Sequence, residues 1–472
     1  MRKLSLVTAL LLSACMVGPD YKAPSVELPQ SWPAQPTAAD QASMQLQQDW
    51  WKQFNDPKLS ALEEEGLAAN ADIALAAARV AEARAILHLN EAQLYPNLSA
   101  QAGAERTSLS PTTEEGATLN GKPYNEFSVA AVLDYEIDLW GKLRRADEAA
   151  RAQLLGEQAN RDAVRLAVAS DIATGYFNLL ALNAQEAVTH DTIKARQVAY
   201  NYDEKQFKAG SIDVLSFRRA EAELAIAEAA LPTIAQARIE QQNALSLLLG
   251  RSPKAMVELP VTANQSIAAL PIPPHLPADA PSTLLQRRPD VSAAEQQLIA
   301  ANAEIGVASA DYYPTLSLSA LIGLASADLD RTLRGHSRAW DIGATGTMPI
   351  LDFGRTAANV DAAKARTQQA LVTYQQTVRS AFVDVLNALN RIQTAAARGK
   401  AEARNVRANE ETTRVAGLRY NAGYATQLDL VDAQRQLFEA QLDSIDARRD
   451  ELSSTVTLYK AMGGGWQAPA AK

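Results

Sequence analysis

The stretch RYNAGYATQLDLVDAQR, residues 419–435, decides how this sequence is interpreted, because a fainter copy of it lies upstream. The copy, FKAGSIDVLSFRRAE, covers residues 207–221 and is displaced by 213 positions, the spacing between Gly210 and Gly423. In each copy the glycine separates two helical patterns, which predicts a tight turn between two helices. We therefore expect the tips of two helical hairpins in an internally duplicated chain.

The duplication extends to the segments before the tips, where Pro96 and Pro314 are equivalent at an offset of 218. Two runs of alternating apolar and polar residues follow each proline, and a period of two predicts β-strands. Each repeat is therefore expected to contain a β-hairpin, over residues 97–137 and 315–350.

The longest uninterrupted patterns are the proline-free runs of residues 142–208 and 355–421. At 1.5 Å per residue each predicts a helix of roughly 100 Å, far longer than a globular domain needs. After each tip a shorter return helix ends near Gly250 or Gly463, and the heptad spacing of its apolar residues indicates coiled-coil packing. We expect two antiparallel helical columns per repeat and four per chain.

The N-terminus has the layout of an export signal. Arg2 and Lys3 precede an apolar run that ends near Leu12. Cys15 is the only cysteine, so no intrachain disulfide is possible. The segment LSAC, residues 12–15, resembles a bacterial lipobox, which implies cleavage before Cys15 and a covalent lipid on it. Met16 follows the cysteine. An aspartate at this position would imply retention in the inner membrane, so the methionine favours the outer membrane.

The composition excludes several classes of protein. The net charge is −9 and no cluster of Lys and Arg is present, so a nucleic-acid partner is not expected. The four histidines are scattered, and no catalytic, phosphate-binding or metal-ligand spacing is found. We expect neither an enzyme nor a bound metal or cofactor, apart from the lipid on Cys15.

Beyond the signal, no apolar run of eighteen residues predicts a transmembrane helix. A chain without one crosses a membrane as a closed β-barrel, since open strand edges leave backbone groups unpaired in lipid. Four strands cannot close a barrel, whereas three chains supply twelve strands and a lumen. The predicted fold class is therefore mainly α with a transmembrane β-barrel, as a trimer that shares a 12-stranded β-barrel and a 12-column α-helical coiled-coil barrel. The alternative for the strands is a soluble sandwich with one solvated face.

Several motifs give the chain a specific resemblance. They are the lipobox, VGPDY (17–21), WWKQF (50–54), LLQRRPDV (284–291), the duplicated hairpin and LYKAMGGGW (458–466). Together they resemble the outer-membrane factor family, the TolC-like group, in its lipoprotein branch with OprM and NodT. The resemblance implies an exit duct for drugs or other small molecules in a tripartite efflux pump. Its implied partners are two further copies of the chain, a periplasmic adaptor, a proton-driven inner-membrane transporter and outer-membrane lipid, and most of its mass is then periplasmic.

The candidate gate follows the second tip. Leu428 and Asp432 are four residues apart, so they share a helix face, and Arg435 is three further on. In a trimer they would form an apolar ring and an acidic ring, which block a pore by dewetting and select by charge. The resemblance implies that these two residues constrict the periplasmic mouth, with Asp429 and Arg435 beside them. The alternative is that the acids only stabilise a helix start.

The turns themselves are candidate adaptor-docking tips, at Phe207, Gly210, Tyr420 and Gly423. The predicted segments are a signal peptide (1–14), an extended arm (15–57), a first repeat (58–250), a Pro-rich equatorial connector (251–288), a second repeat (289–463) and a tail (464–472). Two other functions stay open from the sequence. One is a type I protein-secretion duct, and the other is a lipid-anchored periplasmic coiled-coil structural or adaptor protein.

Overall fold

The computed structural model describes residues 16–29, 32, 49–118, 120–263, 265–273, 284–333 and 336–466. The predicted signal peptide, Cys15 and residues 467–472 of the predicted tail lie outside these ranges. The chain forms two compact units, and each draws on both repeats. Unit 1 comprises Met1–Ser25, Arg79–Glu157 and Ala293–Gln375, and unit 2 comprises Val26–Ala78, Gln158–Ser292 and Gln376–Lys472.

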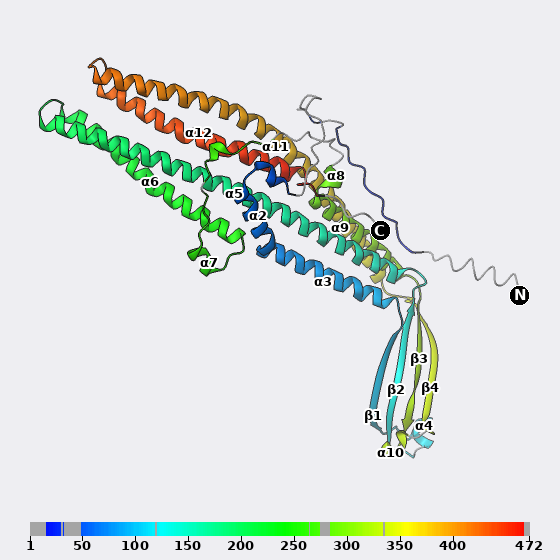
Figure 1. Ribbon diagram of the computed structural model, residues 1–472. Helices are drawn as coiled ribbons and strands as arrows, with labels where there is room; N and C mark the ends of the chain where they lie inside the picture. Colours follow the sequence, from blue (N-terminus) through cyan, green and yellow to red (C-terminus); the bar gives the residue numbers. More distant parts are fainter. Residues whose placement is uncertain are drawn as a thin grey trace. The chain divides into compact units, whose positions relative to one another are not determined.

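Unit 1 contains a four-stranded antiparallel sheet in the order β1-β2-β3-β4 (Figure 1). Its strands are β1 (Asn97–Thr107), β2 (Tyr124–Ile137), β3 (Thr315–Ser326) and β4 (Arg338–Thr347). The connections hold short helices, α4 (Glu114–Thr118) and α10 (Leu329–Thr332). The second hairpin ends at Thr347, not at residue 350 as predicted, because Pro349 has no N–H for a ladder and restricts the residue before it. β1 and β4 are the edge strands.

One face of the sheet is mainly apolar and the other mainly polar, as its alternation predicts, although Val132 and Leu321 pair on the polar face. Ile322 pairs with Ala131 on one side and Trp340 on the other, so these residues share a face. Trp340 is 74% exposed and Ile342 75% exposed, which is unusual for apolar side chains without a covering layer. The opposite face carries polar residues such as Asp134 and its partner Ser319.

Four helices contribute to unit 1. They are α3 (Ala71–Gln93) from Arg79 onward, α5 (Lys142–Lys208) as far as Glu157, α9 (Pro289–Ala310) from Ala293 onward, and α11 (Arg355–Asn421) as far as Gln375.

An extended arm, which begins just after Cys15, packs against the helices of unit 1. The amide of Val17 donates to the Trp140 carbonyl at 3.0 Å, and the buried Arg145 side chain pairs with Asp20 at 2.7 Å. Gly18 and Gly306 approach so closely that a side chain on either would collide with backbone.

Unit 2 holds the two hairpins, in which α5 returns through α6 (Val214–Leu248) and α11 through α12 (Gln427–Ala461) (Figure 1). Its core lies beside η2 (Trp50–Phe54) and α2 (Pro57–Ala69) and is built from large aromatic side chains. Trp50 stacks on Tyr459 with ring centroids 5.4 Å apart, and Phe54 contacts Phe177 at 4.9 Å. Each such side chain contributes about 1.5–3 kcal/mol on full burial.

The Pro-rich connector contains short helices that the sequence does not predict. They are α7 (Pro253–Glu258), η3 (Ile267–Ala269) and α8 (Leu284–Arg287). α7 forms because Ser252 accepts the Ala255 amide as its N-cap and Pro253 occupies the first helical position, where proline is favourable. Over the residues described, no helix combines the length and apolar character needed to cross a membrane.

Candidate gate and hairpin tips

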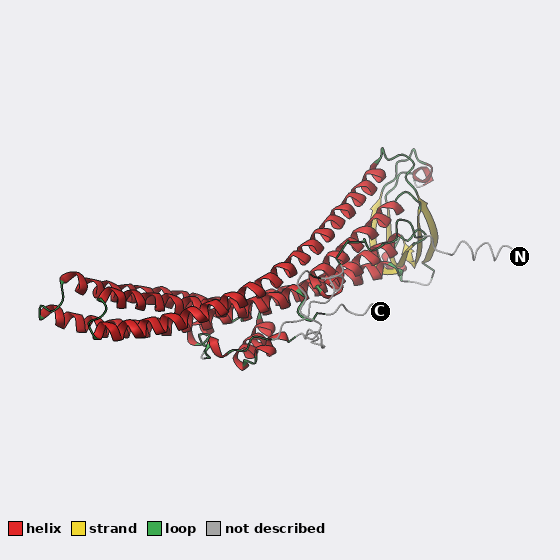
Figure 2. Ribbon diagram, turned by 90° about the horizontal axis from the view of Figure 1, so that it is seen from above, coloured by secondary structure: helices red, strands yellow, loops and turns green. Residues whose placement is uncertain are grey.

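The two tips have the same backbone conformation. Gly210 has a φ of 74° and Gly423 a φ of 75°, a left-handed conformation that glycine adopts without strain. The amide after each glycine donates to the carbonyl five residues earlier, from Ser211 to Gln206 and from Tyr424 to Arg419, both at 2.8 Å. This pattern closes the C-terminus of a helix. Figure 2 shows both turns at the free ends of the hairpins.

The helices that leave the tips are capped differently. Asp213 accepts the Ser216 amide at 2.7 Å at the start of α6. At the start of α12, Thr426 accepts the Asp429 amide while the Asp429 carboxylate accepts the Thr426 amide, a reciprocal capping box. Hydrogen bonds from Thr426 hold the pKa of the Asp429 carboxyl below its ordinary value. Asp429 therefore has a local structural role at the helix start.

The structure brings the other predicted gate residues to one face of α12. Leu428 is 50% exposed, so its side chain is free to meet another molecule. The Asp432 carboxylate is held from both sides, at 2.5 Å by Arg435 and at 2.8 Å by the amide of Gln436. A shallow hollow of about 400 Å³ contains Leu428, Asp429, Asp432 and Gln436. The exposed acid is thus oriented by a cation on its own helix.

The predicted docking residues differ in how far they are open to a partner. Phe207 stacks on Phe217 with ring centroids 5.0 Å apart and planes inclined by 3°, so part of its surface is covered. Tyr420 lines a groove between the hairpins. A side chain built on Gly210 or Gly423 would meet nothing within 4 Å, so both turns are open to a partner.

The groove between the hairpins contains functional candidates that the sequence does not indicate. The side-chain amide of Gln427, in the first turn of α12, donates to the buried Asp203 of α5. Arg196 of α5 is 5% exposed, pairs with Glu223 at 3.1 Å and lies 5.6 Å from the Phe438 ring centroid. The groove has a volume of about 390 Å³. It is lined mainly by Val198, Tyr202, Tyr420, Leu430, Val431 and Gln434.

Burial dominates the electrostatics of this groove. It raises the pKa of the Asp203 carboxyl, which the hydrogen bond from Gln427 only partly offsets. It lowers the pKa of the Arg196 guanidinium, against the opposing attraction of Glu223. Both groups sit on α5 and contact residues of α12, so they link the first hairpin to the second. No sequence pattern distinguishes them from exposed charges on a long helix.

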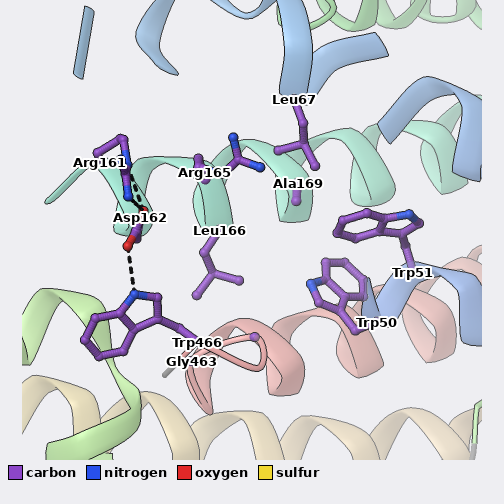
Figure 3. A pocket seen from close by; sticks show the side chains of 11 residues that line it. Trp50, Trp51, Leu67, Arg161, Asp162, Arg165, Leu166, Ala169, Gly463 and Trp466 are labelled. Carbon is purple, nitrogen blue, oxygen red and sulfur yellow. Dashed lines mark hydrogen bonds and ion pairs between the residues drawn. The ribbon is translucent and has the colours of Figure 1, made fainter. Parts of the chain in front are cut away.

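Residues of two of the sequence motifs line a separate pocket of about 320 Å³ (Figure 3). Trp50 and Trp51 come from the WWKQF motif, and Trp466 ends the LYKAMGGGW motif. The Trp466 indole N–H donates to Asp162 of α5 at 2.9 Å, as the dashed line in Figure 3 marks. Asp162 is also held by Arg161 at 2.6 Å. The two motifs, far apart in the sequence, therefore line one pocket with residues of α5, and this packing gives them a structural role.

Among the residues that the structure describes, no three His, Cys, Asp or Glu side chains are grouped as metal ligands. His88 is the one histidine with an ion-pair contact in these ranges, to Glu91 at 2.9 Å on an exposed helix face.

Comparisons with known proteins cover nearly the whole chain. A family model described as "Outer membrane efflux protein" matches residues 62–251 and 280–464. The cation efflux system protein CusC of Escherichia coli O6:H1 is 32% identical over 463 residues, 97% of each chain. The antibiotic efflux pump outer membrane protein ArpC of Pseudomonas putida is 31% identical over 98% of this chain and 94% of its own. The solved CmeC outer membrane channel of Campylobacter jejuni matches with a TM-score of 0.88 at 25% identity, over 97% and 96% of the two chains.

Proposed function

Because this chain belongs to the outer membrane efflux protein family, we propose that it carries drugs or other small molecules through a pore whose periplasmic mouth is gated by Leu428 and Asp432. The cargo proposal follows the relatives, of which ArpC is named for antibiotics and CusC for cations.

Family membership confirms the coarser predictions made from the sequence. The protein is an outer-membrane exit channel of an efflux pump and not an enzyme. Its fold is that of the trimeric outer-membrane channels, mainly α-helical with a small sheet. The resemblance to the outer-membrane factor family is confirmed as well.

The observation that carries the gate proposal is the face of α12 shared by Leu428 and Asp432. Leu428 is half exposed although it is apolar, and Asp432 is exposed although Arg435 and Gln436 hold it. Three copies of this face around one axis would place an apolar ring next to an acidic ring. Arg435 on the same helix would reduce the repulsion between the three carboxylates.

The equivalent positions of the first tip provide a matched control. Leu215 and Arg219 precede Leu428 and Asp432 by 213 residues. The double variant Leu428→Ser with Asp432→Ser is expected to raise single-channel conductance in planar bilayers roughly twofold or more, by removing both constrictions. The variant Leu215→Ser with Arg219→Ser is expected to conduct like the parent channel. An unchanged conductance in the first variant, with trimers intact, would refute the gate.

We also propose that the channel docks through its tips, near Phe207, Gly210, Tyr420 and Gly423, onto a periplasmic adaptor bound to a proton-driven transporter. The open space around both glycines supports this proposal. Cysteines placed beside Gly210 and Gly423 should crosslink to the adaptor, whereas cysteines in α7 should not.

A covalent lipid on Cys15 completes the proposed function. The arm just after it is fixed by Val17, Asp20 and Arg145, so an anchor at Cys15 would start from a defined place on unit 1. Labelling with radioactive palmitate should mark the parent protein, and the variant Cys15→Ala should stay unlabelled.

A further inference from the structure

Each return helix ends against the start of the helix that leads to the strands. In the first repeat, the side chain of Asn70 makes this joint. Its amide donates to the Leu248 carbonyl at the end of α6, at 2.9 Å. Its carbonyl oxygen accepts the Asp72 amide at 2.9 Å and the Ile73 amide at 3.1 Å, which caps α3. Asn70 thus bonds to two helix ends at once.

The second repeat has Arg288 at the equivalent position, 218 residues later, the offset that also separates Pro96 from Pro314. Its guanidinium donates to the Ala461 carbonyl at the end of α12, at 3.0 Å. It also holds Asp290 of α9 at 2.7 Å and Asp384 of α11 at 3.1 Å. Arg288 is 9% exposed, so these bonds are shielded from water.

The glycines after the return helices show that the two joints are built alike. A side chain on Gly250 would collide with the main chain at Ala69, and one on Gly463 with the main chain at Arg287. These contacts are equivalent in the two repeats. The joints differ in chemistry, because the first is a neutral amide that ties two helices and the second is a buried cation that ties three.

The long helices of the two repeats, α5 and α11, also differ in their contact with the joint. Asp171 of α5 is equivalent to Asp384 at the offset of 213, but it lies 3.7 Å from Lys460 rather than on the joint residue. In the second repeat, therefore, the long helix and the return helix of the hairpin are fixed to one side chain. This is the hairpin that carries Leu428 and Asp432.

A small tilt at this joint has a large effect at the tip. Leu428 and Ala461 are ends of one helix, 33 residues and roughly 50 Å apart, so a tilt of about 5° moves Leu428 by about 4 Å. We propose that Arg288 is the positioning residue of the gate: by holding α12, α11 and the start of α9 together, it sets the direction of the second hairpin and hence the width at Leu428. This inference rests on the proposed gate.

The guanidinium suits this role because its planar fork bonds several acceptors in fixed directions. Lysine has one charged nitrogen and cannot reproduce the geometry toward Asp290, Asp384 and the Ala461 carbonyl together. Asp384→Asn keeps an oxygen that can accept a hydrogen bond from Arg288 but removes the negative charge, so it weakens the tie to α11 and leaves the other two bonds in place.

The test compares Arg288→Lys and Asp384→Asn with Asn70→Ala, the matched change in the first joint. Single-channel conductance in planar bilayers measures the gate, and heat-resistant trimers on a gel with the thermal melting temperature measure folding. We expect Asp384→Asn, at a half-exposed carboxylate, to raise conductance about twofold with trimers and melting temperature unchanged. Arg288→Lys should raise it further, and Asn70→Ala should leave it unchanged.

The outcomes separate this inference from the gate proposal. If the Leu428 and Asp432 double variant opens the channel but Asp384→Asn and Arg288→Lys do not, Arg288 has no positioning role and the gate stands. If the double variant has no effect, the gate is wrong and the inference falls with it. If Asn70→Ala opens the channel as much as Asp384→Asn, the second joint has no special role. If Arg288→Lys forms no trimers, the conductance of Asp384→Asn alone tests whether Arg288 positions the gate.

Discussion

The first hairpin tip is closed by stacked aromatic rings, whereas the second is held by polar side chains of its own first turn. Phe217 lies between Tyr200, at 5.5 Å, and Phe207, at 5.0 Å, and is buried. Its counterpart 213 residues later is the half-buried Leu430, which lines the groove instead. The backbones of the two turns are the same. Duplication has therefore kept the turn and changed what stabilises it, and the tip with the weaker apolar packing is the one that carries the proposed gate.

The largest expected effect tests this difference in packing directly. Phe217→Ala should destabilise the first tip by about 3 kcal/mol, near the lower end for aromatic truncations because the site is close to solvent. Leu430→Ala should cost the second tip about 1 kcal/mol, since its side chain is only partly buried. Amide hydrogen exchange of the residues flanking each turn measures both. Equal losses at the two tips would contradict the comparison.

The turns themselves should respond alike. Gly210→Ala and Gly423→Ala each force a side chain into the left-handed conformation, at a cost of about 1–2 kcal/mol, with no steric clash to add to it. Limited proteolysis at the two tips should report similar increases in cleavage. A clearly larger effect at one turn would show that its surroundings, and not the backbone alone, resist the change.

The capping box of α12 is expected to contribute less. Thr426→Ala removes the acceptor for the Asp429 amide and should destabilise the first turn by about 1 kcal/mol. Thr426→Ser keeps the hydroxyl and serves as the control. The exchange rate of the Asp429 amide measures the change, and equal rates in both variants would show that the hydroxyl is dispensable.

The sequence alone predicts the duplication, the two long helices and both turns, because each depends on local signals that recur at fixed offsets. The helices Lys142–Lys208 and Arg355–Asn421 span the predicted residues. The short helices of the connector depend on caps such as Ser252, which proline-rich composition hides. The contacts of Asp203, Arg196 and Arg288 were not predicted, because each joins residues between 27 and 224 positions apart whose proximity only packing determines.

The smallest expected effect concerns the contact that joins the two tips. Burial raises the pKa of the Asp203 carboxyl, so the folded state favours the protonated acid. Its stabilising contribution is fully present below the ordinary aspartate value of 3.8 and is lost as the pH rises through the raised folded-state pKa. The buried contact between α5 and the start of α12 should therefore be better protected below the raised pKa of Asp203 than above it, because desolvation of the ionised carboxylate outweighs the stronger hydrogen bond that Gln427 then donates. Asp203→Asn keeps a carbonyl acceptor for Gln427 and removes the titration, so hydrogen exchange at this point should lose its dependence on pH beyond the intrinsic rate. If the parent and Asp203→Asn show the same pH dependence, Asp203 does not couple the first hairpin to the second, and the two tips differ only in their own packing.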